Sequence, residues 1–182
     1  MLSDDYRKNL VGLHGNAKWG SSTDIPQMAL EAVANYEIKT LLDFGSGKGK
    51  VSETFRQTFP ELSVHSYEPA LEGATLPDQT EMTFSKDVLE HVEPHMLEYV
   101  LYDLHQRTTK VQYHLIACHK AVHYLPDGRN AHLIIETPDW WQRLFRSMGF
   151  QIRAENVIGD IKHPPGRASI ATTKYECLLE RS

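Results

Sequence analysis

The chain has 182 residues, of which 41% are hydrophobic and 24% charged, so its length and composition suit one globular domain spanning residues 1–182. A formal net charge of −5 argues against a broad basic surface for nucleic acid, although it leaves a local basic groove open. No apolar run approaches the roughly 20 residues that cross a bilayer, the first residues do not read as a signal peptide, and two cysteines suit a reducing compartment. We therefore expect a cytoplasmic protein with no membrane contact.

The predicted elements alternate between helices and strands along most of the chain. After a short N-terminal helix and a Gly/Ser/Asn-rich loop, helices are predicted over 27–36, 50–59, 93–108 and 139–149. Strands are predicted over 38–44, 62–69, 82–89, 111–119, 150–159 and 173–180. This alternation predicts an α/β sandwich around a mostly parallel, twisted sheet. The last two strands have no helix between them, which indicates one antiparallel strand at the end.

Two connections carry further information. Only residues 70–81 separate the second and third predicted strands, which is too short for a helical crossover, so we expect a sheet that is shortened after its second strand. Residues 163–173 are rich in turn formers and are expected to form a loop between the last two strands. We interpret this loop as a mobile lid.

The segment Asp43-Phe44-Gly45-Ser46-Gly47-Lys48-Gly49 follows the first predicted strand. An ATP-binding P-loop needs Ser or Thr after its lysine, and here Val51 follows Lys50. A dinucleotide fingerprint needs a third glycine where Lys50 stands. An acid two residues before G-x-G-x-G instead suits S-adenosylmethionine, because glycines let the backbone lie against the cofactor and the acid can face its ammonium group.

Glu68, followed by Pro69, ends the second predicted strand and gives an independent indication of the cofactor. An acid at this position can accept hydrogen bonds from both ribose hydroxyls. A solvated charge at a strand end is the alternative interpretation. The glycine loop at this spacing favours the ribose role.

Several blocks of the sequence resemble class I S-adenosylmethionine-dependent methyltransferases, and in particular small methyltransferase-like proteins encoded by phages and prophages. These blocks are "LLDFGSGKGK", "YEPA", "DVLEHVEPHMLEYVL", and "LPDGRNAHLI" followed by "DWW". The resemblance implies a Rossmann-like class I methyltransferase sandwich, with a lid formed by about residues 1–25. The expected cofactor-binding residues are Asp43, Gly45, Ser46, Gly47, Gly49, Glu68, Pro69, Asp87, Trp19 and Gly20.

One departure from the family concerns adenine recognition. The usual third-strand acid that contacts the adenine amine has no counterpart here, so we expect this contact to come from backbone atoms near residues 85–88. The candidate catalytic residues are Asp87 and His91. Asp87 either borders the cleft or caps the following turn, and His91 is either a general base or a structural residue.

The turn Pro126-Asp127-Gly128 precedes a polar cluster that we interpret as the acceptor side. Arg129 could hold a carboxylate or phosphate of the acceptor, or it could brace the loop together with Asn130. Adjacent tryptophans point about 100° apart on a helix, so one is expected in the core and the other at the pocket. The expected acceptor-binding residues are His119, Arg129, Asn130, His132 and Trp141.

The sequence predicts no metal site, because no spacing among its ten histidines matches a known ligand pattern. It lacks the Asp/Asn-Pro-Pro-Tyr/Phe motif of DNA amino-methyltransferases and the Pro-Cys pair of base-carbon methyltransferases. We therefore expect methyl transfer to a small-molecule, nucleotide or saccharide acceptor. The alternatives are a phage enzyme that modifies nucleic acid, and a protein that senses or consumes S-adenosylmethionine without transferring its methyl group.

Overall fold

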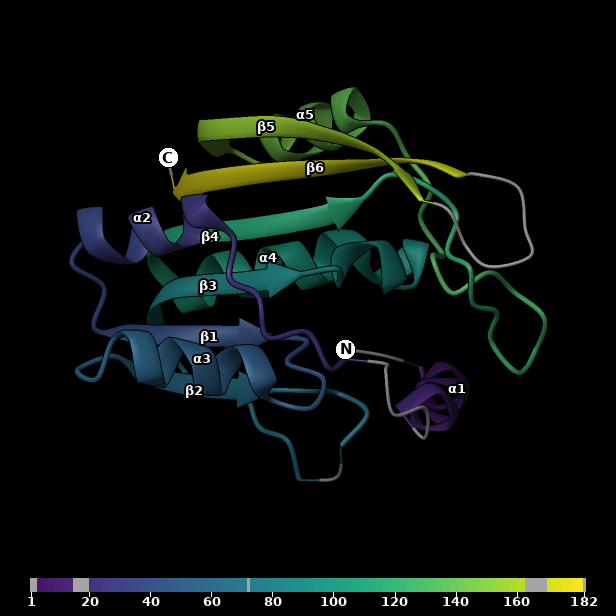
Figure 1. The fold of residues 1–182 in the computed structure, drawn as a ribbon, viewed down its shortest axis with the longest axis horizontal. Coiled ribbons are helices and arrows are strands. Elements are labelled where there is room, and N and C mark those ends of the chain that lie inside the picture. Colours follow the sequence, from purple (N-terminus) through teal and green to yellow (C-terminus); the bar gives the residue numbers. More distant parts are fainter. Residues whose placement is uncertain (1–2, 15–19, 72, 163–169, 182) are drawn as a thin grey trace.

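A computed structural model describes residues 3–14, 20–71, 73–162 and 170–181 (Figure 1). The helices are α1 (Asp4–His14), α2 (Gln27–Asn35), α3 (Lys50–Thr58), α4 (Leu97–Arg107) and α5 (Pro138–Ser147), with short 3₁₀ turns η1 (Leu89–His91) and η2 (Pro94–Met96). The strands are β1 (Thr40–Phe44), β2 (Ser63–Tyr67), β3 (Thr80–Lys86), β4 (Thr108–Ala117), β5 (Phe150–Lys162) and β6 (Ile170–Arg181). No helix within these ranges is long and apolar enough to span a membrane.

The strands form a six-stranded sheet in the order β2-β1-β3-β4-β6-β5. The pairings among β2, β1, β3 and β4 are parallel, whereas β6 runs antiparallel to both β4 and β5. The predicted mostly parallel sheet with one antiparallel strand from the end of the chain is therefore confirmed. That strand lies between β4 and β5, which leaves β5 at the edge of the sheet.

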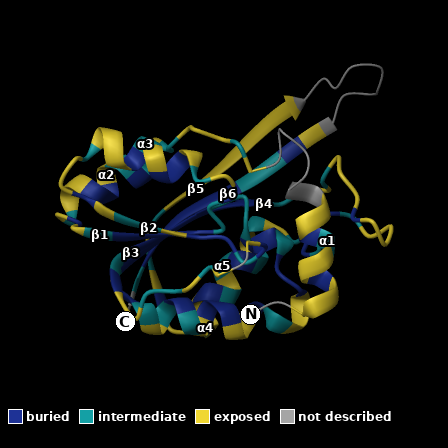
Figure 2. Cartoon of the chain, turned by 90° about the horizontal axis from the view of Figure 1, so that it is seen from below, coloured by how far each residue is buried: buried dark blue, intermediate teal, exposed yellow. Residues whose placement is uncertain are grey.

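Helices cover both faces of the sheet (Figure 2). Helices α2 and α3 pack on one face, in a core that includes Leu41 and Phe84, and α4 and α5 pack on the other, in a core that includes Leu42 and Phe44. Consecutive residues of β1 thus point into opposite cores, as the pleat of a strand requires. A strand buried on both faces explains the continuous apolar run of its sequence.

The short connection after β2 is confirmed, since residues 68–71 and 73–79 contain no helix and lead directly into β3. Strand β1 pairs with β2 on one side and with β3 on the other. The chain thus runs from β1 to its neighbour on one side and then crosses back to the other side, so the strand order reverses at β1. Open α/β sheets bind ligands at the carboxyl ends of strands beside such a switch point. Helix α1 lies at this end of the sheet (Figure 1).

Several predicted boundaries differ from the structure, and two of them lie close to the carboxyl ends of the strands. The strand expected over 82–89 ends at Lys86, because Asp87 has a positive φ of 54° and η1 follows. The loop expected over 163–173 is shorter, because the backbone of residues 170–173 pairs with β5 as part of β6. Residues 163–169 lie outside the described ranges.

Candidate functional site

The glycine loop turns sharply between β1 and α3 and is tied to the end of β2. The amides of Gly45 and Ser46 both donate to the carbonyl of Tyr67, at 2.8 and 3.0 Å. Gly47 has a φ of 54°, and a Cβ added to it would lie 2.7 Å from the Cα of Gly20. Two backbones thus meet at these glycines, so the segment before α2 is held against the loop and any side chain on Gly47 would push it away.

Asp43, at the end of β1, is a buried carboxylate beneath this loop. Its side chain is only 3% exposed and accepts a hydrogen bond of 2.5 Å from the hydroxyl of Ser52. Ser52 in turn accepts a hydrogen bond from Ser66, at 2.7 Å. Burial raises the pKa of Asp43 to about 6, against the lowering influence of Ser52 and Arg56. A buried carboxyl group with a raised pKa at the end of a parallel strand is a candidate for a functional role.

Glu68 closes the loop from the side of β2. Its carboxylate is 7% exposed and accepts hydrogen bonds from the amides of Gly47, at 3.0 Å, and Ala70, at 3.1 Å. An ionised carboxylate has about four acceptor positions, and the two backbone bonds engage one on each of its oxygens. Glu68 and Pro69 both line the cavity described next.

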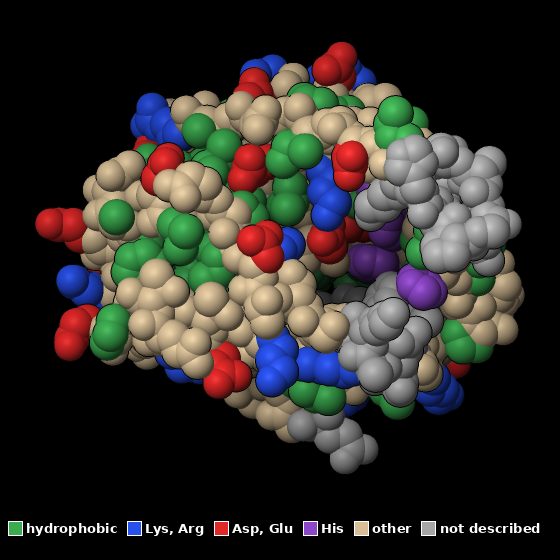
Figure 3. Space-filling view, viewed as in Figure 1, with side chains coloured by type: hydrophobic (Ala, Val, Ile, Leu, Met, Phe, Trp, Pro, Cys, Tyr) green, Lys and Arg blue, Asp and Glu red, His purple; other side chains and the backbone are tan. Residues whose placement is uncertain are grey.

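A cavity of about 750 Å³ opens at the carboxyl ends of β1 and β3. Histidine side chains gather at one side of this hollow in the space-filling view (Figure 3). Its walls include most of the residues singled out from the sequence, namely Gly20, Asp43, Gly45, Ser46, Gly47, Glu68, Pro69, Asp87, His91, His119 and His132. Gly49, Arg129, Asn130 and Trp141 are not among its lining residues, and Trp19 lies outside the described part of the chain.

Arg129 and Asn130 brace their own loop rather than face the cavity. Arg129 forms an ion pair of 2.7 Å with Asp127, and its guanidinium lies 5.9 Å from the ring centroid of Tyr6. The Asn130 side chain accepts from the amide of Ala121 and donates to its carbonyl, at 3.0 and 2.9 Å. These contacts fasten the loop to itself and to α1, as in the alternative interpretation from the sequence, and neither residue lines the cavity.

The placement of Trp141 at the pocket was also wrong. Trp141 is fully buried, with its ring centroid 5.1 Å from that of Trp140 and 5.9 Å from that of Phe145. Trp140 is partly buried and packs against the same core between α5 and the sheet. Both tryptophans therefore stabilise the fold, and neither lines the cavity.

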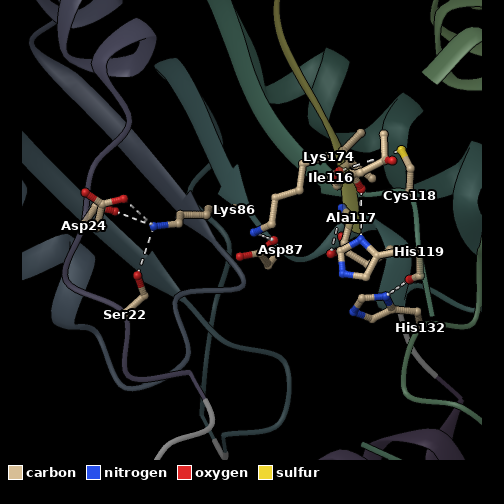
Figure 4. A network of polar contacts seen from close by, with 12 residues as sticks. Ser22, Asp24, Lys86, Asp87, Ile116, Ala117, Cys118, His119, His132 and Lys174 are labelled. Atoms are coloured by element: carbon tan, nitrogen blue, oxygen red, sulfur yellow. Dashed lines mark hydrogen bonds and ion pairs between the residues drawn. The ribbon is translucent and has the colours of Figure 1, made fainter. Parts of the chain in front are cut away.

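Asp87 borders the cavity, as predicted from its place after β3. Its carboxylate accepts a hydrogen bond of 2.5 Å from the Lys174 ammonium on β6, whereas Lys86 turns the other way toward Asp24 (Figure 4). The alternative role as a cap is not observed, since η1 begins after Val88 with no side-chain capping bond. Asp87 is thus held at the cavity wall by a cation from a distant strand.

His91, His119 and His132 line the same side of the cavity. The rings of His91 and His132 meet edge to face at 4.9 Å, and those of His119 and His132 at 5.5 Å. Burial, reinforced by His132, lowers the pKa of His91 to about 4, and burial also lowers the pKa of His132. Both rings are therefore neutral at pH 7.

Sequence reasoning missed many residues of the wall, among them three from elements at the two ends of the chain. Tyr6 and Leu10 reach the cavity from α1, and Lys174 reaches it from β6. The hydroxyl of Tyr6 donates to the carbonyl of His91, which fastens the helix over the site. Only the helical spacing of Tyr6 and Leu10, one turn apart, could have indicated a shared buried face.

The sheet order, the glycine loop and the cavity at the switch point together define the Rossmann-like fold of class I S-adenosylmethionine-dependent methyltransferases. The structure superposes with a TM-score of 0.67 on the 1,6-didemethyltoxoflavin-N1-methyltransferase of Burkholderia thailandensis, crystallised with its substrate and S-adenosylhomocysteine. Sequence identity is 12%, over 97% of this chain and 87% of that one.

Two other solved structures show the same fold. TehB from Haemophilus influenzae gives a TM-score of 0.62 at 12% identity, over 88% of this chain and 64% of that one, so this chain spans less than two thirds of TehB. A candidate RNA methyltransferase from Pyrococcus horikoshii gives 0.56 at 12% identity, over 96% and 98% of the two chains. No protein-family model and no curated protein matches the sequence.

Proposed function

We propose that this chain binds S-adenosylmethionine in the cavity and transfers its methyl group to a small-molecule, nucleotide or saccharide acceptor. The observation that carries the proposal is the bond between the Glu68 carboxylate and the Gly47 amide, which places an acceptor of ribose hydroxyls against a backbone that only glycine can form. Asp43 supplies a buried negative charge for the cofactor's ammonium group. The residues present therefore fit this cofactor.

The size and chemistry of the cavity support this assignment. A volume of about 750 Å³ falls within the range of sites for small ligands. Val88 lines the wall beside Gly45, where the backbone after β3 could contact the adenine ring in place of the missing third-strand acid. The solved methyltransferase of the same fold that holds both a small substrate and S-adenosylhomocysteine supports a small acceptor.

The acceptor would lie toward the loop that follows β4. That loop contributes His119, Lys120 and His123 to the cavity wall, and His132 follows further along the chain. Methyl transfer from a sulfonium to the acceptor is an in-line displacement in which the C–S bond breaks as the bond to the acceptor forms, so positioning contributes more than proton transfer. We propose that Asp87 marks the boundary between the cofactor and the acceptor, and that neutral His91 faces the acceptor.

Incubation with methyl-labelled cofactor and fractionated cell extract tests the activity directly. We expect label to appear in the small-molecule or saccharide fraction. Label in DNA or RNA, together with binding that falls steeply with added salt, would instead support modification of nucleic acid. Breakdown of the cofactor with no labelled acceptor would contradict methyl transfer and support a protein that senses or consumes the cofactor.

Replacing Glu68 with glutamine tests the cofactor site itself. The amide keeps the shape but offers only one acceptor oxygen, so either Gly47 or Ala70 loses its buried partner and the ribose loses a charged acceptor. We expect the affinity for S-adenosylhomocysteine, measured by calorimetry, to fall by about tenfold or more. Glu61→Gln removes an exposed carboxylate near the start of β2 and should bind as the unmodified protein does. Equal affinities of both variants would refute the ribose role.

A further inference from the structure

Three potential metal ligands from two separate segments of the chain meet beside the part of the cavity wall that His91 and His132 line. Glu90 and His91 lie in η1, directly after β3, and His132 lies in the loop that follows β4. One ligand atom from each residue lies within 4.8 Å of the other two. No ligand spacing is visible in the sequence, because the cluster forms only where the segment after β3 meets the loop after β4 at the same edge of the sheet.

Both imidazoles are oriented by backbone carbonyls. The Nδ1–H of His91 donates to the carbonyl of Ala131 at 2.6 Å, and the Nδ1–H of His132 donates to the carbonyl of His119. Because a carbonyl can only accept, each proton is fixed on Nδ1 and each lone pair lies on Nε2. Metal-binding histidines are oriented in this way, and the neutral ring is the form that binds a metal ion.

Glu90 contributes a carboxylate in a fully buried position. Its Oε1 accepts a hydrogen bond from the amide of Ala117 at 3.1 Å, while its Oε2 has no hydrogen-bond partner among the described residues. A buried carboxylate oxygen without a partner is costly, and a cation is the partner that would satisfy it.

We propose that Glu90, His91 and His132 form a binding site for a first-row divalent transition-metal ion. Two imidazoles and one carboxylate suit Zn²⁺ and its neighbours in the row, whereas Mg²⁺ and Ca²⁺ prefer sites built from oxygen alone. Ligands of a tetrahedral ion lie about 3.3–3.5 Å apart, since each bond is roughly 2.0–2.2 Å. Because the ligand atoms lie within 4.8 Å of one another, the three side chains would close by at most about 1.4 Å around the ion.

Three protein ligands leave at least one coordination position open, as in catalytic rather than structural metal sites. His91 and His132 line the cavity, so the open position faces the space assigned to the acceptor. An ion there would bind and polarise an oxygen of the acceptor, which favours a hydroxyl-bearing molecule. This use of the metal rests on the proposed function, whereas the binding of the metal does not.

The test measures metal binding to the chelator-treated full chain in the absence of any cofactor. Calorimetry with Zn²⁺, Mn²⁺ and Mg²⁺ in turn should show one tightly bound Zn²⁺ or Mn²⁺ per chain and weaker binding of Mg²⁺. Loading with Co²⁺ should give a visible d–d absorption band from the bound ion. His132→Ala and Glu90→Gln should each weaken binding by at least tenfold and remove the Co²⁺ band.

His95→Ala is the matched control, since it removes an exposed histidine in η2 outside the cavity wall. Absence of stoichiometric binding, preference for Mg²⁺, or equal loss in the His95 and His132 variants would overturn the proposal. Thermal unfolding of the metal-free variants checks folding, and if the buried Glu90 variant does not fold, the His132 variant decides. S-adenosylhomocysteine binding is measured separately on the same samples. Zn²⁺ binding without it would refute the proposed function and leave the metal site standing.

Discussion

Replacing Gly47 with alanine should weaken the binding of S-adenosylhomocysteine by at least about a hundredfold. A Cβ on Gly47 would lie 2.7 Å from both the Cα and the carbonyl oxygen of Gly20, closer than any real Cβ contact. Both neighbours are backbone atoms, so relief requires the segment before α2 to move away from the glycine loop. That movement would also displace the Gly47 amide from Glu68. Calorimetric titration with S-adenosylhomocysteine measures the loss.

Gly49→Ala is the control for backbone strain. Gly49 also has a positive φ, 71°, so alanine at either glycine costs about 1–2 kcal/mol of unfolding free energy. A Cβ on Gly49 would meet nothing within 4 Å, and Gly49 does not line the cavity. The control should therefore lose stability but keep its affinity. If both variants bind equally well, the contact between Gly20 and Gly47 has no part in cofactor binding.

The residues predicted to bind the cofactor line the cavity more often than those predicted to bind the acceptor, for a physical reason. The residues from Asp43 to Gly47 are consecutive in the sequence. Their glycines are required by the local backbone conformation, so a short sequence motif can identify them. Glu68 follows the next strand, and adjacent parallel strands bring their carboxyl ends together. The segment from β1 to the end of β2 therefore indicates both the conformation of the glycine loop and the position of Glu68 beside it.

The part of the cavity proposed for the acceptor is formed by residues that are far apart in the sequence. The pairing of the strands throughout the sheet brings them together. Lys174 reaches Asp87 because β6 lies antiparallel beside β4. The sequence around Lys174 and the sequence around Asp87 do not indicate that these two residues meet. Arg129 looked available for a ligand in the sequence, but Asp127, two residues away, already pairs with it. Trp141 was misplaced because helical spacing shows that two adjacent rings diverge without showing which one faces the core.

Replacing Asp43 with asparagine should stabilise the cofactor-free protein at neutral and alkaline pH. Burial raises the pKa of Asp43 from 3.8 to about 6, so the folded state holds this proton more tightly than the unfolded state does. Between these two pH values the folded protein binds more protons, and stability falls as the pH rises through them. Once the carboxyl is ionised, the cost is roughly 3 kcal/mol of unfolding free energy. Asparagine stays neutral and avoids that cost, while its carbonyl oxygen can still accept the hydrogen bond of Ser52.

Urea unfolding at pH 4 and pH 8 separates this effect from a change in packing. The variant should differ little from the unmodified protein at pH 4 and exceed it by up to about 3 kcal/mol at pH 8. Asp78→Asn, in the exposed loop before β3, is the control for replacing a carboxyl group that lies outside the core. The same Asp43 variant should bind S-adenosylhomocysteine more weakly at pH 8, because it lacks the carboxylate charge that we propose faces the ammonium group. That same charge is the one that lowers the free energy of unfolding. Greater stability with undiminished binding would show that the Asp43 charge does not serve the cofactor.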